Sequence, residues 1–285
     1  MKNKICVVTG ATSGIGAATA LELARQGARV LLVGRNRARC ASSVARIRRQ
    51  TGNASVEFRV ANLASMAEVR RLAEELRQTC PRVDVLVNNA GGYFLGPRKI
   101  TLEGYELTFA LNHLAYFLLT HLLLEPLQAS PSARVVNLAS QAHEKGAIDF
   151  QDLEGLLGYD GFKAYAQSKL ANVLFTYELA RQLAGTKVTA NAVHPGSVAT
   201  HFGKNNGWLR FWIRRLLKRS ELTAAQGAET VVYLASAPEV EGVTGKYFVN
   251  KRAVESSPSS HDPDLAQRLW QVSREMIGLT VAMKD

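Results

Sequence analysis

The sequence predicts a single doubly wound α/β domain, in which a seven-stranded parallel sheet is covered by helices on both faces. The first observation behind this prediction is that short β-branched or apolar runs alternate with longer helical patterns along the whole chain. The second is that 285 residues with 47% hydrophobic content are enough to bury one sizeable core. Because no internal repeat, low-complexity tract or linker interrupts the pattern, we expect one domain over residues 1–285.

The individual elements follow from hydrophobic periodicity and from turn and cap residues. We expect strands near residues 4–9, 29–33, 55–60, 83–87, 134–138, 187–193 and 246–249. We expect helices near residues 14–26, 36–50, 65–79, 102–128, 161–184, 221–236 and 263–277. Ser65 can cap the third helix, and Asp262 followed by Pro263 supplies a cap and a first-turn proline for the last one.

The amino-acid composition limits the kinds of ligand that we expect this protein to bind. Lys and Arg outnumber Asp and Glu by 35 to 24, which suits a protein that binds nucleic acid, an anionic surface or phosphorylated ligands. The arginines are dispersed along helices without an aromatic stacking motif, which argues against nucleic acid. Cys6, Cys40 and Cys80 are too few and too far apart for a disulfide framework, so we expect a reducing, cytoplasmic setting.

Neither a signal peptide nor a membrane span is expected. The N-terminus leads directly into the first strand, and no stretch approaches the ~20 apolar residues that a membrane span requires. We therefore expect a protein that is soluble or at most peripheral to a membrane. The histidines show no metal-ligand spacing, so we expect no metal; they are His113, His121, His143, His194, His201 and His261.

A glycine-rich turn joins the first strand to the first helix. It reads Thr9-Gly10-Ala11-Thr12-Ser13-Gly14-Ile15-Gly16. Glycine permits a left-handed turn and lets backbone N–H groups approach an anion, while the positive end of the helix dipole points at the same place. Glycine turns also serve tight strand-to-helix packing, but the first strand–turn–helix unit of such folds is where nucleotides bind. A pyrophosphate would fit here.

The end of the second strand indicates which dinucleotide would bind. An NAD enzyme usually has a carboxylate here for the adenosine 2′-hydroxyl, whereas a 2′-phosphate needs a cation. This chain has Gly34 and then Arg35, with no acid, which favours NADP(H) over NAD(H). The alternative is that Arg35 is one more solvated arginine beside Arg37 and Arg39.

Tyr165 and Lys169 are the main candidates for proton chemistry. A separation of four residues places the phenol and the ammonium on one helical face, and a nearby cation favours the phenolate and lowers the tyrosine pKa. The fifth strand delivers Ser140 to the carboxyl edge of the sheet, where ligands of open α/β folds bind. The fourth strand brings 88–91 (Asn-Asn-Ala-Gly) to the same edge, and Asn112 lies on the next helix.

With these motifs assembled, the chain resembles the short-chain dehydrogenase/reductase family, whose domains are of the Rossmann type. The family carries a Thr-Gly-x-x-x-Gly-x-Gly turn, an Asn-Asn-Ala-Gly segment, a serine after strand five and Tyr-x-x-x-Lys, and all four occur here in order. The resemblance implies that Tyr165 is the acid/base and that Ser140 polarises the carbonyl. It implies that Lys169 binds the nicotinamide ribose and lowers the Tyr165 pKa, and that Asn112 holds a water in a proton relay.

The resemblance also implies cofactor contacts. The backbone of Asn89, Ala90 and Gly91 would line the adenine-ribose side. Further contacts are implied in the loop after the sixth strand, at Pro195, Gly196, Val198 and Thr200. The family usually has Asp-Leu after strand three, and here it is Asn62-Leu63; an asparagine carbonyl can still accept a bond from the adenine amino group, so adenine recognition would be weaker.

Within the family the chain looks similar to the retinol dehydrogenase-like group, through residues 112–117, 165–172, 244–248 and 266–279. This likeness implies a lipophilic alcohol, aldehyde or ketone as substrate, retinoid-like or otherwise apolar. The alternatives are a reductase of steroid, quinone or xenobiotic carbonyls, and a regulatory protein that binds NADP(H) without turnover, which would have no need for Ser140, Tyr165 and Lys169 together.

A strongly amphipathic basic segment runs from Trp208 to Arg219. In this family the segment after the Pro-Gly loop, here about 201–220, covers the substrate, so this helix is expected to form an apolar lid. Its tryptophans and basic flanks equally suit a peripheral membrane contact, and packing on the core or on a second subunit is the third alternative. We expect a C-terminal extension over about 251–285, and a homodimer or homotetramer that pairs through the helices near 102–128 and 161–184.

Overall fold

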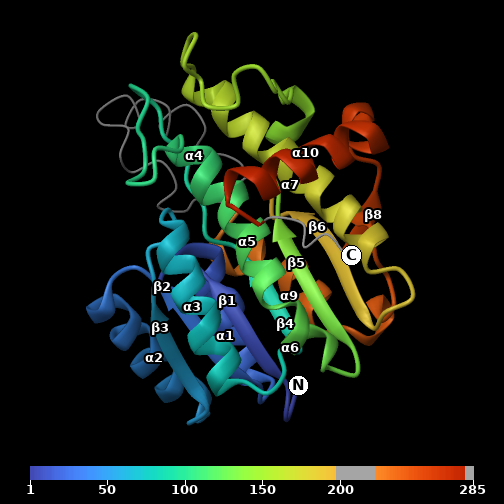
Figure 1. Cartoon of the computed structure of the whole chain (residues 1–285). Helices are drawn as coiled ribbons and strands as arrows, with labels where there is room; N and C mark the ends of the chain where they lie inside the picture. Colours follow the sequence, from blue (N-terminus) through green and yellow to red (C-terminus); the bar gives the residue numbers. More distant parts are fainter. Residues whose placement is uncertain (197–221, 280–285) are drawn as a thin grey trace, which may run out of the picture.

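One mixed sheet organises the computed structural model, which describes residues 1–196 and 222–279. Its strand order is β3-β2-β1-β4-β5-β6-β7-β8 (Figure 1). All neighbouring pairs are parallel except β7 and β8, which are antiparallel. The strands are β1 Ile5–Thr9, β2 Arg29–Gly34, β3 Val56–Val60, β4 Val85–Asn88, β5 Ala133–Leu138, β6 Val188–His194, β7 Lys246–Val249 and β8 Arg252–Val254.

The sheet has one strand more than the seven predicted. Asn250 and Lys251 adopt left-handed backbone angles, φ 50° and 64°, and turn the chain tightly so that Val249 pairs with Arg252. Two left-handed residues in a two-residue loop match the twist of a hairpin. The sequence pattern misses β8 because its three residues are all exposed and carry no apolar alternation.

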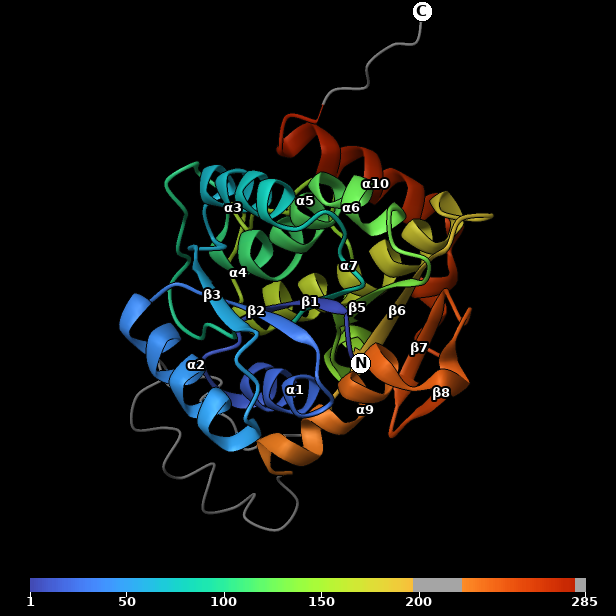
Figure 2. The same ribbon diagram turned by 90° about the horizontal axis from the view of Figure 1, so that it is seen from below.

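Helices cover both faces of the sheet (Figure 2). In β1, Cys6 and Val8 face a core formed with α1, α2 and α9, whereas Ile5 and Val7 face a core formed with α3, α5, α7 and α10. This alternation is the period of two that a strand imposes. The helices are α1 Gly14–Arg25, α2 Arg37–Thr51, α3 Met66–Thr79, α4 Leu107–Phe109, α5 Ala115–Leu122, α6 Leu124–Gln128, α7 Gly161–Gln182, α9 Ala224–Ser236 and α10 Pro263–Met276.

The helix predicted near 102–128 is shorter and interrupted. Gly104 has φ 90°, and the side chain of Glu106 accepts a hydrogen bond from the Phe109 N–H, so the helical segment begins only at Leu107. A π-helical turn, Ala110–Leu114, separates α4 from α5, and a break at Leu123 separates α5 from α6. Apolar spacing alone does not reveal a π-turn, which inserts an extra residue into an otherwise helical pattern.

The two predicted caps are confirmed. The Ser65 side chain accepts a hydrogen bond from the Glu68 N–H at the start of α3, and Asp262 accepts from two backbone N–H groups at the start of α10. The helix predicted from 221 begins at Ala224, where Thr223 forms a capping box with Gln226.

The chain order creates a topological switch point at the carboxyl edge of the sheet. β1 is followed by α1 on one face, and β4 is followed by α4 and α5 on the opposite face, although β1 and β4 are neighbours. Ligands of doubly wound sheets bind at such a switch point, because the loops leaving the two strands separate there. The residues that follow β1, β4 and β5 therefore meet at one place.

Candidate active site

The turn after β1 is shaped for a close backbone approach. Gly10 and Gly14 have φ 65° and 56°, angles that other residues rarely adopt. A Cβ on Gly16 would lie 2.6 Å from the Gly10 carbonyl oxygen, so only glycine fits there. The twelve-residue helix α1 begins here, and the side chain of its N-cap residue, Ser13, makes no capping hydrogen bond. The helix N-terminus and its N–H groups can therefore face an anion.

Thr9 and Asn89 hold this turn against the end of β4. The Thr9 hydroxyl donates to the Val87 carbonyl and accepts from the backbone N–H groups of Asn89 and Ala90, at 2.8 and 2.9 Å. The Asn89 side chain donates to the Thr9 carbonyl at 2.7 Å. Asn89 thus supports the turn with its side chain, in addition to the backbone role predicted for it. Thr9 is a site residue that the motif contains but that spacing alone does not single out.

The ends of β2 and β3 lie side by side at this edge. The Ala61 N–H donates to the Gly34 carbonyl at 3.1 Å, so Arg35 and Asn62 leave neighbouring strands at the same level. Arg35 is exposed, Leu63 is buried and Asn62 is exposed. The Asn62 Oδ1 already accepts from the Ala64 N–H at 3.2 Å, which leaves one lone pair for another donor.

Ser140, Tyr165 and Lys169 come together as predicted. Ser140 follows β5 and forms a hydrogen bond with the Tyr165 side chain. The Ser140 Oγ also accepts from the Ala142 N–H at 3.2 Å. Lys169, one turn further along α7, is 4% exposed, and its Nζ lies 5.7 Å from the Tyr165 ring centre.

Lys169 is buried with unused hydrogen-bonding capacity. Its Nζ donates to the Leu138 carbonyl at 3.1 Å, an oxygen that also accepts from Asn172 Nδ2 at 3.0 Å. An ammonium carries three donors. Within residues 1–196 and 222–279, no second acceptor within hydrogen-bond distance is assigned to the Lys169 Nζ. A ligand with hydroxyl or anionic groups would fit beside it.

Burial shifts the pKa values of Tyr165 and Lys169 in opposite directions. Burial raises the pKa of Tyr165 to about 12, with the Ser140 hydrogen bond acting in the opposite direction. Burial also lowers the pKa of Lys169 to about 7, so this cation is only partly charged near neutral pH. In both groups burial is the largest cause and favours the neutral form. That Lys169, together with a bound nicotinamide, lowers the Tyr165 pKa stays a prediction.

Asn112 belongs to the π-helical turn and not to an α-helix. Its Oδ1 accepts from the Gly92 N–H at 2.8 Å, and its Nδ2 donates to the Gly92 carbonyl and to Ser168 Oγ, both at 3.0 Å. A Cβ on Gly91 would lie 3.0 Å from the Asn112 Oδ1. The Asn112 side chain thus fixes the loop after β4 to α7. Its role in a proton relay stays a prediction.

Two tyrosines beside the site were not predicted from spacing. The Tyr93 ring lies 4.9 Å from the Tyr165 ring, centre to centre, and 6.5 Å from that of Phe162. Tyr116 is 1% exposed, its ring centre lies 6.0 Å from Lys169 Nζ, and its hydroxyl has no hydrogen-bond partner among the described residues. Tyr93 thus places an aromatic ring beside Tyr165, whereas Tyr116 fills the buried side of the site next to Lys169.

The loop after β6 is described only at its start. Pro195 and Gly196 are half-buried, and Gly196 has φ 82°. A Cβ on Gly196 would lie 2.5 Å from the Leu222 side chain. The predicted contacts Val198 and Thr200, the segment 201–220 and the amphipathic stretch 208–219 lie outside the described residues.

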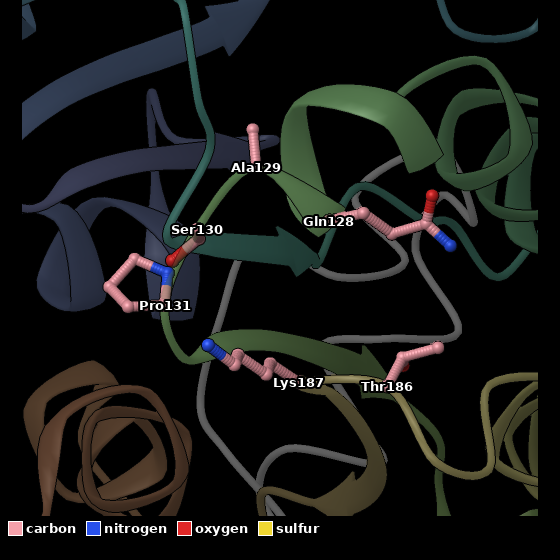
Figure 3. A pocket seen from close by; sticks show the side chains of 6 residues that line it. All are labelled: Gln128, Ala129, Ser130, Pro131, Thr186 and Lys187. Carbon is pink, nitrogen blue, oxygen red and sulfur yellow. The ribbon is translucent and has the colours of Figure 1, made fainter.

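An open hollow of about 490 Å³ lies elsewhere, at the amino ends of β5 and β6 (Figure 3). It is lined by Gln128, Ala129, Ser130, Pro131, Thr186 and Lys187. These residues precede the two strands, so the hollow is at the edge of the sheet opposite Ser140. It does not take part in the site at the carboxyl edge.

Residues 1–196 and 222–279 contain neither a helix that could span a membrane nor a cluster of metal-ligating side chains. No helix among these residues has the length and hydropathy needed to cross a lipid bilayer. No group of three or more His, Cys, Asp or Glu side chains in this part of the chain is arranged to hold a metal ion.

Comparison with known proteins identifies relatives over the whole chain. The short chain dehydrogenase family matches residues 4–207. Human retinol dehydrogenase 14 is 41% identical, over 98% of this chain and 88% of its own. A crystal structure of an uncharacterised protein from Mycobacterium paratuberculosis aligns with a TM-score of 0.78 and 33% identity, over 97% of this chain and 94% of that one.

A further solved structure, the Pseudomonas aeruginosa RhlG/NADP active-site complex, aligns with a TM-score of 0.70 and 27% identity. It covers 87% of this chain and 94% of that one. Matching motifs, fold and relatives agree over nearly the full length. The chain belongs to the short-chain dehydrogenase/reductase family of oxidoreductases and is retinol dehydrogenase-like within it.

Proposed function

We propose that this protein is an NADP(H)-dependent oxidoreductase that interconverts a lipophilic alcohol and its aldehyde or ketone, with Tyr165 as the acid/base. The observation that carries the proposal is the meeting of Ser140, Tyr165 and Lys169 beside the glycine turn at one edge of the sheet. A protein that only senses a dinucleotide would need the turn but not the three side chains.

Ser140, Tyr165 and Lys169 would each have a different role in the transfer of the proton. When bound, NADPH would supply a hydride to the carbonyl carbon. Tyr165 would give its phenolic proton to the carbonyl oxygen, and the raised pKa of Tyr165, about 12, keeps this proton in place at neutral pH. Ser140 Oγ accepts from the Ala142 N–H and is hydrogen-bonded to the Tyr165 side chain, so both hydroxyls could donate to a substrate oxygen bound beside them. The Lys169 ammonium, with its Nζ 5.7 Å from the Tyr165 ring centre, could restore the Tyr165 proton.

The cofactor preference rests on the end of β2. Arg35 is exposed where a 2′-phosphate would lie, and no acidic residue occurs between Gly34 and Arg39. Arginine suits phosphate because its planar guanidinium can donate two hydrogen bonds at once. The glycine cradle and the spare donors of Lys169 fit the pyrophosphate and a ribose, respectively. The NADP-bound state of one structural relative supports the same choice.

An apolar substrate suits the approach to Tyr165. Tyr93 and Phe162 meet edge to face beside it, and Phe162 is 39% exposed. The names of the curated relatives point to retinoids. Retinoid-like carbonyls are therefore the first class to test, followed by other lipophilic carbonyls.

The test is NADPH oxidation measured over retinal, medium-chain aldehydes, steroids and quinones. Tyr165→Phe should bind NADPH like the wild type and lose turnover by about 100-fold or more on every compound that the wild type reduces. Tyr233→Phe removes a hydroxyl from α9, on the other face of the sheet, and should leave turnover unchanged. NADPH binding without any turnover by the wild type would contradict the enzyme assignment, and turnover by Tyr165→Phe would contradict the role of Tyr165.

A further inference from the structure

His143 lies three residues after Ser140 and uses both ring nitrogens. Its Nδ1 is 2.7 Å from the Ser140 carbonyl oxygen, and its Nε2 is 3.0 Å from the backbone nitrogen of Ser257. A carbonyl can only accept and a backbone N–H can only donate. The imidazole must therefore carry its proton on Nδ1 and leave Nε2 bare, which fixes one neutral tautomer.

The surroundings keep the ring in this state. His143 is fully buried, and its ring lies tilted against that of Tyr247 in β7, 4.8 Å away centre to centre. Burial lowers the pKa of His143, while the hydrogen bond to the Ser140 carbonyl and, after it, the charge of Glu144 act in the opposite direction. A second proton on Nε2 would also face the Ser257 N–H, so protonation would break that bond.

Three contacts within this short turn hold Ser140, in addition to its hydrogen bond with the Tyr165 side chain. Its carbonyl accepts from the His143 N–H at 3.1 Å as well as from Nδ1, and its Oγ accepts from the Ala142 N–H. The two bonds to its carbonyl oxygen fix the backbone of Ser140, and the bond to Oγ restrains its side chain. The direction of the Ser140 hydroxyl follows from this backbone.

Ser257, whose N–H donates to His143, lies in the C-terminal extension. Ser257 follows β8 and precedes a 3₁₀ turn, Pro258–His261. Its neighbour Ser256 is fixed to α7, because the Ser256 and Tyr177 hydroxyl oxygens lie 2.7 Å apart. His143 therefore connects a segment anchored on α7 to the residue that follows β5.

We propose that His143 is a positioning residue for Ser140, and that the Ser257 N–H sets its tautomer and so couples the C-terminal extension to the catalytic serine. The proposal rests on the proposed function in one respect: it takes Ser140 as the group that binds the substrate carbonyl. The link between Ser257, His143 and Ser140 can be tested without that assumption.

Ser257 offers a matched pair of variants. Its φ of −60° is already the angle that proline requires, so Ser257→Pro removes the N–H donor while keeping this backbone angle. Proline also places its ring carbon against His143 Nε2. Ser257→Ala removes only the hydroxyl and keeps the N–H. Because this ring carbon takes the place of the N–H hydrogen, a difference between the two variants reports on the whole contact between residue 257 and His143 Nε2.

The first measurement is ¹⁵N NMR of the histidine-labelled protein, which does not depend on activity. We expect the His143 signals of the Nδ1–H tautomer, unchanged in Ser257→Ala and altered in Ser257→Pro. An Nε2–H tautomer, or a charged ring at neutral pH, would overturn the proposal whatever the enzyme reduces.

The second measurement is turnover on whichever carbonyl the wild type reduces. Loss of one buried hydrogen bond in this chain of contacts should lower kcat about 10-fold in Ser257→Pro and in His143→Phe, with the NADPH Kd and the KM little changed. The double variant should be no slower than His143→Phe, because both changes act through one ring. If Ser257→Pro does not fold, the test uses two other variants, His143→Phe and His143→Gln. Their kcat is compared with that of Ser257→Ala.

The outcomes separate the two proposals. A wild type that reduces no carbonyl, together with the expected NMR signals, contradicts the proposed function and leaves the structural link intact. Folded Ser257→Pro and His143→Phe proteins with wild-type kcat would show that His143 does not position Ser140.

Discussion

At the scale of single residues, burial dominates the chemistry of the site. It raises the pKa of Tyr165 to about 12 and lowers that of Lys169 to about 7. In both cases the neutral form is favoured, because a low-dielectric interior penalises charge of either sign. The protonated phenol can give its proton to a carbonyl that is being reduced. The charge of Lys169 is then the property of the site that changes with pH near neutrality.

Loss of the Lys169 charge should therefore lower the rate of the reaction at higher pH. Its ammonium is present below its pKa of about 7 and is lost above it, so kcat/KM for NADPH should fall as pH rises through this region. In Lys169→Arg the guanidinium stays charged, and the falling limb should disappear even if the rate is lower. A pH profile of NADPH oxidation checks this; an unchanged limb in Lys169→Arg would assign the titration to another group.

Arg35 should decide between the two nicotinamide dinucleotides. Arg35→Asp replaces a cation by an anion where the 2′-phosphate would bind, and should weaken NADPH binding about 10-fold or more with little change for NADH. Arg46→Asp makes the same charge change at an exposed position of α2 and serves as the control. Kd values from the quenching of protein fluorescence measure both. Equal binding of the two dinucleotides by the wild type would contradict the assignment.

At the scale of elements, the π-turn and α10 are joined by a buried histidine. His113 is fully buried, its Nε2 lies 2.9 Å from Ser273 Oγ, and burial lowers its pKa to about 3. The unfolded chain takes up this proton near the ordinary value of about 6.5. Acidification between these two values must therefore stabilise the unfolded state.

The stability of the protein should reflect this proton. Between about pH 7.5 and pH 4.5, His113 should account for about 2.5 kcal/mol of the loss in the free energy of unfolding. His113→Leu should lack this share of the pH dependence, although it is less stable at neutral pH because Ser273 loses its partner. Urea unfolding at the two pH values measures it. Ser273→Ala keeps the imidazole and should keep the pH dependence; an equal pH dependence in His113→Leu would contradict the prediction.

At the scale of the whole molecule, α10 covers part of the surface of α5 and α7. Trp270 is 7% exposed, and its ring centre lies 5.0 Å from that of Phe117, 4.8 Å from that of His121 and 5.8 Å from that of Phe175. These partners belong to α5 and α7, the helices through which pairing with a second copy was predicted. Figure 2 shows α10 beside both helices.

Because α10 occupies this surface, we expect the chain to sediment as a monomer. Trp270→Ala should lower the free energy of unfolding by about 3–5 kcal/mol and promote self-association through the uncovered apolar face. Gln271→Ala, at an exposed position of α10, is the control and should do neither. Analytical ultracentrifugation and urea unfolding test both parts. A wild-type dimer that persists in Trp270→Ala would place pairing on another surface.

The sequence alone determined the fold class, the order of the elements, two helix caps and the group of candidate residues at the carboxyl edge. These features follow from local rules: apolar periodicity, glycine turns, cap residues and the direction of parallel strands. That is why Gly10, Ser140, Tyr165 and Lys169 could be named before the structure, even though they are distant along the chain.

The tertiary structure decided what depends on packing between distant segments. Only the packed interior shows that burial raises the pKa of Tyr165 and lowers that of Lys169, that His143 joins Ser140 to Ser257, and that α10 covers α5 and α7. A π-turn and a hairpin of exposed residues likewise leave no periodic signal. Desolvation, and a hydrogen bond between residues 114 positions apart such as that from Ser257 to His143, arise only when the chain has folded. No local sequence pattern could therefore predict them.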